Sequence, residues 1–421
     1  MSLEVHYNLR RNYPSIENVT EHNSLKMSSS ANKIKVVWLC YFTNSAIQEK
    51  LKPFRKVDEI APWISNLIPL FENDKDIELH IISQHRWIPW HKSFIKDGIT
   101  YHFINKGIPL SGRHWPGFFR FDLLTNDFLF NRKIARIIKK INPDIVHLHG
   151  AENEFSASIM QFHNKYPVFI TIQGFINKSS AKSSFIEKRK QDELKIIRMF
   201  KHFGVRTTTM AEDVRLINPN AILHWHPYRM RTVEPENIKK KYDLVYFARM
   251  TKDKGIEDVL RAVAIIKNIK PNISLCAMGA GKTDAFKELA SELGIENNVY
   301  WAGFLPTQND LHRLASSARI SVLPTYHDII PGTIIESMFL GIPVVSYDVG
   351  SIHEVNKNDK IISLIEKGNI EGLAKEITNL LSDENILINR GRKGIERAKE
   401  MFGNPDEEIR LSLMSIYQEI I

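Results

Sequence analysis

Two carboxylates eight positions apart, Asp328 and Glu336, give the sequence its clearest chemical signal. A Pro-Gly turn at Pro331–Gly332 lies between them, and Thr333 then opens a segment with the apolar spacing of a helix. The first residues of a helix offer free backbone N–H groups and the positive end of its dipole to an anion. Glu336, one turn into this helix, can accept hydrogen bonds from a ribose diol, and Asp328 can hold sugar hydroxyls. The pattern therefore indicates a site for an anionic molecule that carries sugar hydroxyls.

Arg249 and Lys254 come directly after an apolar run of strand length, Leu244–Ala248. A planar guanidinium and the compact charge of a lysine together suit a diphosphate. An Arg and a Lys at this spacing are most often ordinary surface residues, but here they share a half-chain with the two carboxylates, which favours a phosphate site. A Walker A loop ending in Gly281-Lys282-Thr283 is excluded, because Cys276 stands at its first glycine position.

Short apolar runs alternate with helical patterns along both halves of the chain. In the first half, strands are predicted at Ile34–Cys40, Ile77–Ser83, Ile145–His149, Val168–Ile172 and Ile222–His226, with helices at Asp127–Ile141 and Lys188–Phe203. In the second half, strands are predicted at Leu244–Ala248, Ser274–Met278, Val299–Gly303, Ile320–Pro324 and Val344–Tyr347, with helices at Gly255–Lys267, Thr283–Leu293, Asp310–Ala315, Thr333–Leu340 and Ile370–Leu381. Such alternation predicts parallel sheets built from βαβ units. The expected fold class is α/β, with two doubly wound, Rossmann-like domains facing a central cleft.

Composition divides the chain into five segments. Residues 1–32 are rich in Ser and Asn and predict a flexible N-terminal extension. One Rossmann-like domain is expected over 33–226 and another over 242–405, joined by a polar hinge at 227–241. Apolar residues at helical spacing predict an amphipathic helix over 406–421.

Two His-x-His pairs raise the question of a metal centre. His147 and His149 end a predicted strand, and strand alternation places them on the same face. His224 and His226 form the second pair, and imidazole is a common zinc ligand. No carboxylate or cysteine at a familiar ligand spacing accompanies either pair, so we expect no metal site.

The chain resembles the family-4 retaining glycosyltransferases, a GT-B fold group that transfers sugars from nucleotide sugars. The family pattern is a strand, an Arg and a Lys-Gly pair, then Glu-x7-Glu and a Gly-x-Pro-Val-Val run. The matching residues here are Arg249, Lys254-Gly255, Asp328-x7-Glu336, Gly341-Ile342-Pro343-Val344-Val345 and Gly350-x3-Glu354. The resemblance covers the C-terminal half and, more weakly, Lys33–Phe175.

The resemblance implies donor-binding roles in the second half. Arg249 and Lys254 would bind the donor diphosphate, and Glu336 would bind the ribose of the nucleotide. Asp328 stands where the family usually has a glutamate that contacts the donor sugar, and its side chain is one methylene shorter. Gly279 and Gly281 match the family's glycine turn near the nucleotide, and the backbone at Pro331, Gly332 and Thr333 would complete the donor site.

In the first half, the resemblance assigns His149 to the place of a strand-end histidine that approaches the donor sugar. Gln173-Gly174 follows the next strand, where relatives have a polar turn. The family's Gly-Gly loop after the first strand is missing, and Tyr41–Ser45 stands in its place.

The implied reaction is retaining transfer of a hexose-type unit from a nucleotide diphosphate sugar to a glycan or lipid-linked acceptor, without a metal or another cofactor. Similar folds return the C-terminal helix onto the first domain, and we expect the same here, with packing inside the second domain as the alternative. A nucleotide-sugar 2-epimerase of the same fold and a non-catalytic GT-B partner subunit are the two rival interpretations.

Composition limits the class of protein. The 421 residues are 43% apolar and 25% charged, which excludes extensive disorder. Cys40 and Cys276 form no CxxC motif, which excludes a disulfide scaffold and a cysteine-based zinc module. No apolar run reaches the roughly 20 residues that span a bilayer, and the polar N-terminus has no signal-like segment. We therefore expect a cytoplasmic enzyme.

Charge and aromatic content bear on the acceptor. The formal net charge is +9, and residues 84–121 contain nine aromatic residues, six Lys or Arg and one acidic residue. Aromatic rings with cations favour contact with the inner face of a membrane, although the rings could also simply pack a lobe against the sheet. We expect a lipid-linked glycan of a bacterial surface polysaccharide as acceptor. No nucleic-acid-binding module is recognisable, so no nucleic-acid partner is expected.

Overall fold

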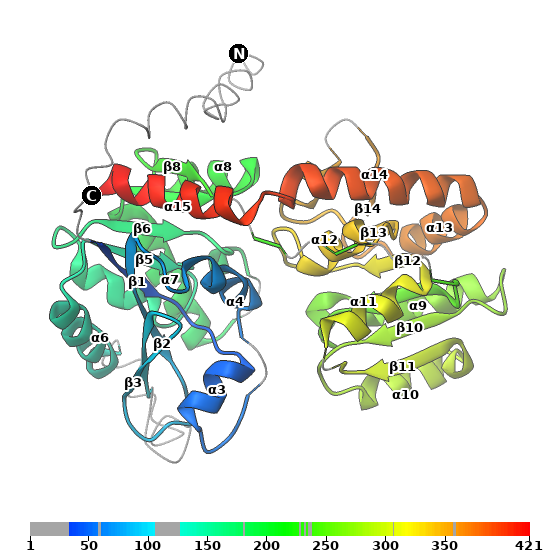
Figure 1. The fold of residues 1–421 in the computed structure, drawn as a ribbon. Coiled ribbons are helices and arrows are strands. Elements are labelled where there is room, and N and C mark those ends of the chain that lie inside the picture. The colour runs from blue at the N-terminus through cyan, green and yellow to red at the C-terminus, as the bar shows by residue number, and fades with distance from the viewer. Residues whose placement is uncertain are drawn as a thin grey trace.

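The computed structural model describes residues 33–421 apart from 58–59, 106–126, 180–181, 227–228, 231–232, 235–237, 306 and 357–358. The predicted extension over 1–32 and part of the predicted hinge lie outside the described residues. The described chain forms two sheets, one in each half, which confirms the predicted α/β class with two Rossmann-like domains (Figure 1).

The first sheet has the strand order β3-β4-β2-β1-β5-β6-β7-β8, and all neighbouring strands are parallel except β3 and β4. Its strands are β1 (Ile34–Leu39), β2 (Ile77–Gln84), β3 (Lys92–Lys96), β4 (Ile99–Ile104), β5 (Ile145–His149), β6 (Val168–Thr171), β7 (His202–Val205) and β8 (Ile222–Trp225). Its helices are α3 (Ser45–Leu51), α4 (Pro62–Leu67), α6 (Phe128–Ile141), α7 (Ser184–Met199) and α8 (Thr208–Ile217), with 3-10 turns η2 (Ile68–Phe71), η3 (Ser156–Phe162) and η4 (Ile176–Lys178). Val36 and Trp38 of β1 pack into one apolar cluster, and Val37 and Leu39 pack into another. Both faces of this strand are therefore covered, which is why its sequence is apolar without alternation.

The second sheet is wholly parallel, with the order β11-β10-β9-β12-β13-β14. Its strands are β9 (Tyr242–Phe247), β10 (Leu275–Met278), β11 (Val299–Gly303), β12 (Ala318–Leu323), β13 (Val344–Tyr347) and β14 (Ile362–Ile365). Its helices are α9 (Ile256–Lys267), α10 (Asp284–Glu292), α11 (Gln308–Ser316), α12 (Gly332–Phe339), α13 (Ile370–Leu381) and α14 (Glu384–Phe402), with 3-10 turns η5 (Lys252–Lys254), η6 (Glu296–Asn298) and η7 (Ile352–Val355). Ligand sites in such sheets lie beyond the carboxyl ends of the strands.

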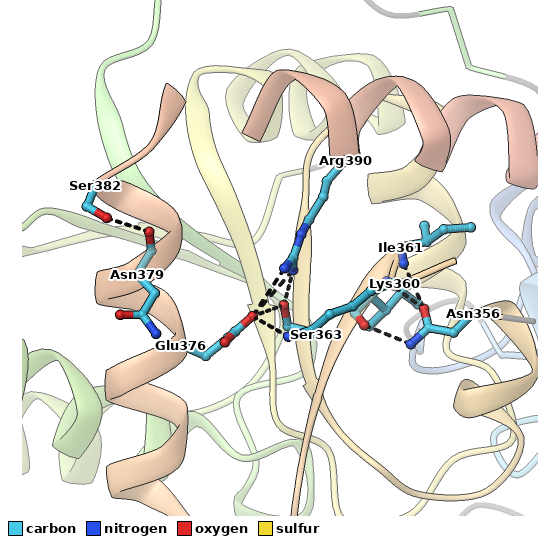
Figure 2. Close-up of polar contacts among 9 residues, drawn as sticks. Asn356, Lys360, Ile361, Ser363, Glu376, Asn379, Ser382 and Arg390 are labelled. Atoms are coloured by element: carbon cyan, nitrogen blue, oxygen red, sulfur yellow. Dashed lines mark hydrogen bonds and ion pairs between the residues drawn. The ribbon is translucent and has the colours of Figure 1, made fainter. Parts of the chain in front are cut away.

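A polar cluster fixes the edge strand β14 between two helices (Figure 2). Ser363 on β14 donates a hydrogen bond of 2.6 Å to Glu376 on α13, and Arg390 on α14 donates to Ser363. Lys360 lies 3.2 Å from the same carboxylate, and Arg390 lies 3.4 Å from it. Burial alone would raise the pKa of Glu376, but the Ser363 and Lys360 hydrogen bonds and the two cations outweigh it and hold that pKa below its usual range.

The C-terminal helix α15 (Asp406–Ile420) leaves the second domain and lies along the first, as the red ribbon in Figure 1 shows. Its buried face shares one apolar cluster with β1, formed on the helix side by Ile409, Leu413, Met414, Ile416 and Tyr417. Arg410 adds an ion pair of 2.6 Å with the buried carboxylate of Asp74. Among the described residues, no helix is both long enough and apolar enough to span a bilayer.

The structure corrects one predicted helix. The pattern over Lys188–Phe203 predicts a single helix, but α7 ends at Met199, and residues 202–205 form strand β7. Phe200 caps α7 in an extended conformation, so the apolar residues after it enter the sheet. Apolar spacing alone cannot separate the end of a buried helix from a short strand that follows it. Strands β3, β4 and β14 were not predicted from the sequence.

Candidate functional site

The loop after β9 brings a lysine against the aspartate of the loop after β12. The Nζ atom of Lys254 lies 2.5 Å from Oδ2 of Asp328, and Thr325 donates a 2.6 Å hydrogen bond to the same oxygen. Both charged side chains are largely shielded, with 13% and 21% of their surfaces exposed. The two sequence-predicted residues therefore form one ion pair at the carboxyl edge of the second sheet.

Glycine makes this close approach possible. Gly255 has φ of 77°, and a Cβ atom there would lie 2.1 Å from the carbonyl oxygen of Pro324. Gly279, with φ of 147°, would bring a Cβ atom within 1.8 Å of the carbonyl oxygen of Ala248. Distances this short leave no room for a side chain, so both loops pack against the strand ends only because these positions are glycine. Gly281 follows in the same loop, and Ala280 between them accepts a hydrogen bond from the N–H of Met250.

Arg249 differs from Lys254 in its surroundings. Its side chain is 64% exposed and lies 3.5 Å from Asp253 at the surface. The carbonyl oxygen of Arg249 accepts a 2.7 Å hydrogen bond from the Tyr246 hydroxyl, which fixes the backbone at the end of β9. The guanidinium of Arg249 thus extends into solvent from a backbone that is held in place, whereas the ammonium of Lys254 is already paired with Asp328.

The start of α12 presents its backbone at the same edge. Thr333 donates its hydroxyl proton to the carbonyl oxygen of Phe247 at 2.9 Å, which ties the helix start to the end of β9. Pro331 is the N-cap residue, and its carbonyl accepts from Ile334 and Ile335, the first amides bonded within the helix. The N–H groups of Gly332 and Thr333 donate to no described residue. This helix start can therefore receive an anion.

Glu336 lies one turn into α12, beside a histidine of α11. His312 Nε2 is 3.6 Å from Glu336 Oε2, and the two side chains are 11% and 20% exposed. The Nε2 atom of His312 is buried without a hydrogen-bond partner among the described residues. A shift of a few tenths of an ångström would bring these two atoms within hydrogen-bond distance, so His312 is placed to orient the Glu336 carboxylate.

Two cavities lie between residues of the two domains. The larger, of about 1040 Å³, is lined by α3, α4 and the loop that precedes α3 on one side and by α11, including His312, on the other. The smaller, of about 490 Å³, is lined by Asp328 together with Gln173, Gly174 and Phe175 of the first domain. The Gln173-Gly174 turn thus faces Asp328 across one cavity. A ligand that contacted both Glu336 and Asp328 would extend from the neighbourhood of the larger cavity to the smaller one.

His149 lies at the end of β5 but lines neither of these cavities. It is 2% exposed, and the centroid of its ring lies 3.7 Å from that of the tilted His147 ring and 4.8 Å from that of the Trp38 ring, which it meets edge-on. Burial lowers the pKa of both histidines well below the usual value, so both are neutral at pH 7. The Nε2 atom of His149 is buried and has no hydrogen-bond partner among the described residues.

His147 belongs to a hydrogen-bond chain that reaches α15. Trp38 Nε1 donates to the Tyr417 hydroxyl at 2.8 Å, and that hydroxyl lies 2.7 Å from His147 Nδ1. On the other side of the ring, His147 Nε2 lies 2.6 Å from the Thr171 hydroxyl. In the His147 tautomer that carries its proton on Nε2, the Tyr417 hydroxyl donates to Nδ1 and Nε2–H donates to Thr171. Neither histidine pair forms part of a group of three or more potential metal ligands within the described ranges.

The sequence did not predict the buried carboxylate that positions the Gln173-Gly174 turn. Glu193 of α7 accepts hydrogen bonds of 3.0 and 2.8 Å from the N–H groups of Ile176 and Asn177, which follow that turn. Burial raises the pKa of Glu193 to about 7, although the two N–H donors favour its charged form. Its signal in the sequence is weak, because a single Glu on a polar helix resembles any surface residue.

The sequence also gave no role to Glu354, which joins the two domains. Its carboxylate accepts 2.8 Å hydrogen bonds from the N–H groups of Thr208 and Thr209 and a 2.7 Å bond from the Thr209 hydroxyl. These residues open α8 of the first domain, so Glu354 caps a helix of the opposite domain. Ser351 adds a 2.8 Å hydrogen bond to Thr207. Because Thr209 also lines the smaller cavity, this contact borders the candidate site.

Comparison with known proteins identifies the class. Two parallel-sheet domains with a phosphate-suited loop, a helix start and two carboxylates at one edge define a GT-B glycosyltransferase. Residues 231–401 match the family described as glycosyl transferases group 1, and residues 71–201 match the family described as glycosyl transferase 4-like. The two matches lie one in each half of the chain and support a family-4-like glycosyltransferase.

Curated relatives share modest identity. The chain is 22% identical over 362 residues to the N-acetyl-alpha-D-glucosaminyl L-malate synthase of Bacillus anthracis, covering 78% of this chain and 92% of that protein. It is 25% identical to the 2-deoxystreptamine glucosyltransferase of Streptomyces kanamyceticus, over 40% of this chain and 46% of that enzyme. It is 24% identical to the capsular polysaccharide biosynthesis glycosyltransferase CapM of Staphylococcus aureus, over 38% of this chain and 42% of CapM. The chain thus spans less than half the length of the latter two relatives.

Solved structures share the fold. Sucrose-phosphate synthase from Thermosynechococcus elongatus superposes with a TM-score of 0.71 at 16% identity, covering 92% of this chain and 99% of that one. Anabaena HepE in complex with UDP and glucose superposes with a TM-score of 0.64 at 14% identity, covering 92% and 100%. These superpositions confirm the GT-B arrangement.

Proposed function

We propose that this glycosyltransferase moves a hexose-type unit from a nucleoside diphosphate sugar to a glycan or lipid-linked acceptor, with retention at the anomeric carbon. The observation that carries the proposal is the Lys254–Asp328 ion pair, because Asp328 lines a cavity that the Gln173-Gly174 turn of the other domain also lines. Such a pair provides a cation for a phosphate and a carboxylate for sugar hydroxyls within one site. The likeness to HepE, solved with UDP and glucose, makes UDP-hexoses the first donors to test.

The donor would extend along the carboxyl edge of the second sheet. Glu336 would hold the ribose, and the loops of Gly279 and Gly281 would face the nucleotide. Arg249, Lys254 and the first N–H groups of α12 would face the diphosphate. Lys254 would leave Asp328 and pair with the phosphate. The carboxylate of Asp328 would then accept hydrogen bonds from the sugar hydroxyls.

Catalysis would rest on stabilising the leaving group. Negative charge grows on the diphosphate as the bond from the anomeric carbon to its oxygen breaks, and fixed cations and N–H donors favour that charge. The acceptor oxygen would bond to the anomeric carbon from the same face and pass its proton to the departing phosphate oxygen. The cations and the helix start supply the positive charge that a metal supplies in other transferases, so we propose that no metal is required.

His149 requires a movement to reach the sugar, because its ring is enclosed in this structure. Such a movement would occur at the contact between Glu354 and the start of α8, because this contact joins the two domains beside the cavity. Domain rearrangement that also excludes water would suppress hydrolysis of the donor.

A curated relative bears on the acceptor and on the location of the enzyme. CapM acts in capsular polysaccharide biosynthesis, which supports a bacterial surface polysaccharide as the product's destination. A lipid-linked acceptor would place the enzyme in the cytoplasm, peripheral to the inner face of the membrane. Part of the aromatic stretch over 84–121 lies outside the described residues.

A transfer assay tests the proposal. UDP-hexoses are incubated with a lipid-linked glycan acceptor, with and without EDTA, and the product's anomeric configuration is read by NMR. Retained configuration with EDTA-resistant turnover is expected. An inverted product or loss of turnover in EDTA refutes the mechanism. Conversion of the nucleotide sugar without an acceptor would instead favour the epimerase, and nucleotide binding without any turnover would favour a non-catalytic subunit.

A further inference from the structure

Helix α6 carries an exposed face without a single acidic residue. The helix contains Arg132, Lys133, Arg136, Lys139 and Lys140, and all five side chains are exposed. Within the described part of the chain, none of these cations forms an ion pair with a carboxylate. The opposite face, with Phe130, Ile134 and Ile138, is buried in the core of the first domain.

Helix stability does not explain this charge pattern. Cations near the last turn, such as Lys139 and Lys140, interact favourably with the helix dipole. Arg132 and Lys133 are the fifth and sixth residues of the helix and lie beyond its first turn, so the dipole does not account for them. Arg136 lies in the middle of the helix, so the dipole accounts for only two of the five cations.

Large apolar side chains are exposed beside these cations. Phe128 and Leu129, the first two residues of α6, are 57% and 63% exposed. Ile95 of the edge strand β3 is 72% exposed. Single exposed apolar residues are common, but here three of them flank one basic face.

The charges of α6 reach the end of β3 that lies beside them. Lys133 and Lys140 both act on His91, which directly precedes β3, and together with burial they lower its pKa. On β3, Phe94 stacks on Tyr101 and packs into the apolar cluster that also holds β1, so Ser93 and Ile95 face the opposite side. Ile95 therefore lies on the side of the sheet that α6 covers, because α6 packs into the apolar cluster of that other face.

The orientation of α6 relates this surface to the cleft. The helix ends at Ile141, three positions before Asp144, whose N–H donates to the carbonyl oxygen of Lys35 at the start of β1, so its last turn lies at the amino edge of the first sheet. A crossover helix runs back along the strands, and its first turn, with Phe128 and Leu129, therefore lies toward the carboxyl edge. The carboxyl edges are where ligands of this fold bind.

We propose that the basic face of α6, with Phe128, Leu129 and Ile95, docks on an anionic lipid bilayer. Lysine and arginine bind the headgroups of anionic lipids, and exposed Phe and Leu side chains enter the boundary between headgroups and acyl chains. A nucleic acid would use the same cations but gain little from the aliphatic residues, which favours lipid. The inference deepens the proposed function, because it rests on a lipid-linked acceptor that reaches the cleft from the membrane.

Vesicle sedimentation of the full chain tests the surface. Vesicles of phosphatidylcholine alone are compared with vesicles that contain about a third phosphatidylglycerol, at low and at physiological salt. The wild-type chain is expected to sediment only with the anionic vesicles, and less at the higher salt. At roughly 1 kcal/mol per cation, Arg136→Gln with Lys140→Gln should weaken binding about thirtyfold.

A matched control separates this surface from net charge. Lys287→Gln with Lys375→Gln removes the same charge from exposed positions of α10 and α13 in the second domain and should change binding less than twofold. Phe128→Ser with Leu129→Ser should weaken binding at the higher salt, where insertion contributes most. Equal losses in both charge variants, equal binding to neutral vesicles, or binding of single-stranded RNA without binding of vesicles would each overturn the proposal.

Nucleotide binding by the same variants separates the two proposals. UDP-induced thermal stabilisation should be the same in the α6 variants and in the wild type, which shows that the variants fold and keep the donor site. Vesicle binding with the expected pattern in a chain that binds no nucleotide supports the surface and counts against the proposed function. Nucleotide binding without a preference for anionic vesicles overturns the surface alone.

Discussion

The contact between Glu354 and the start of α8 permits a quantitative prediction about how the domains are held together. Glu354→Gln keeps the shape of the side chain but replaces one accepting oxygen with an NH2 group. That group would face a backbone N–H, so one of the three hydrogen bonds is lost together with the negative charge at the helix N-terminus. A hydrogen bond to a charged group contributes about 1.5–3 kcal/mol, and an anion at a helix start adds about 0.3–1 kcal/mol.

Because Glu354 is only half-buried, the lower part of these ranges applies. We therefore expect the free energy that holds the two domains together to fall by about 2 kcal/mol. This corresponds to about a thirtyfold increase in the population of the separated state. Hydrogen exchange followed by mass spectrometry on the peptide that covers Thr208 and Thr209 should detect it as faster exchange of those two amides. Exchange within β1 should not change.

Glu371→Gln provides the matched control, because Glu371 also lies in the first turn of a helix of the second domain but is exposed. This control should leave the α8 amides unchanged. If Glu354→Gln also leaves them unchanged, the carboxylate does not hold the domains together and the argument fails. If both variants increase exchange equally, a general loss of stability explains the effect and the specific contact is refuted.

Three further predictions follow from the described contacts. Tyr417→Phe removes the acceptor of the buried Trp38 N–H, and calorimetry should show a destabilisation of about 1–3 kcal/mol, whereas a loss below about 0.5 kcal/mol would contradict the hydrogen-bond chain. The pKa of Asp74 lies below its usual 3.8, because hydrogen bonds from its guanidinium partner on α15 and from two backbone N–H groups outweigh burial. The stability that the Asp74 carboxylate adds is therefore complete above pH 3.8 and is lost as the pH falls through the lowered pKa. Urea unfolding should show that the loss of unfolding free energy in Asp74→Asn becomes smaller in acid. A loss that does not change with pH would contradict this. Asp328→Asn frees Lys254 from its partner. Calorimetric titration should then show UDP binding as tight as in the wild type or tighter, while the rate of sugar transfer falls about a hundredfold. Weaker UDP binding would argue against the assigned roles.

Local signals in the sequence were enough for most strands of the second sheet and for the loops that follow β9 and β12. The strands β9 and β12 are largely apolar, and their ends are marked by Arg249 and by the proline after Leu323, so the position of each loop could be predicted. Lys254 and Asp328 are 74 positions apart, yet parallel strands bring their carboxyl ends to one edge, which is why their meeting follows from topology.

Contacts that depend on the packing of one domain against another could not be predicted. Glu354 and Thr208 are 146 positions apart, and the partner of the carboxylate is a backbone N–H that has no signature in the sequence. The enclosure of His149 has the same origin, because the ring of His147 beside it is held by Tyr417 of a helix that returns from the end of the chain. Strand alternation places both histidines on one face but cannot say what covers that face.

The central claim is that Lys254 and Glu336 belong to a donor site for a nucleoside diphosphate. Thermal unfolding in the presence of a panel of nucleotides and nucleotide sugars tests it directly, with the wild type, Lys254→Ala and Glu336→Ala. Lys252→Ala is the control, because that lysine lies in the same turn but is 80% exposed and pairs with Glu257. A ligand at about 100 times its dissociation constant should stabilise the protein by roughly 2.7 kcal/mol. We predict stabilisation by one family of nucleoside diphosphates in the wild type and in Lys252→Ala, and none in the other two variants. Stabilisation that persists in Lys254→Ala and Glu336→Ala, or that no nucleotide produces in the wild type, would contradict the donor site.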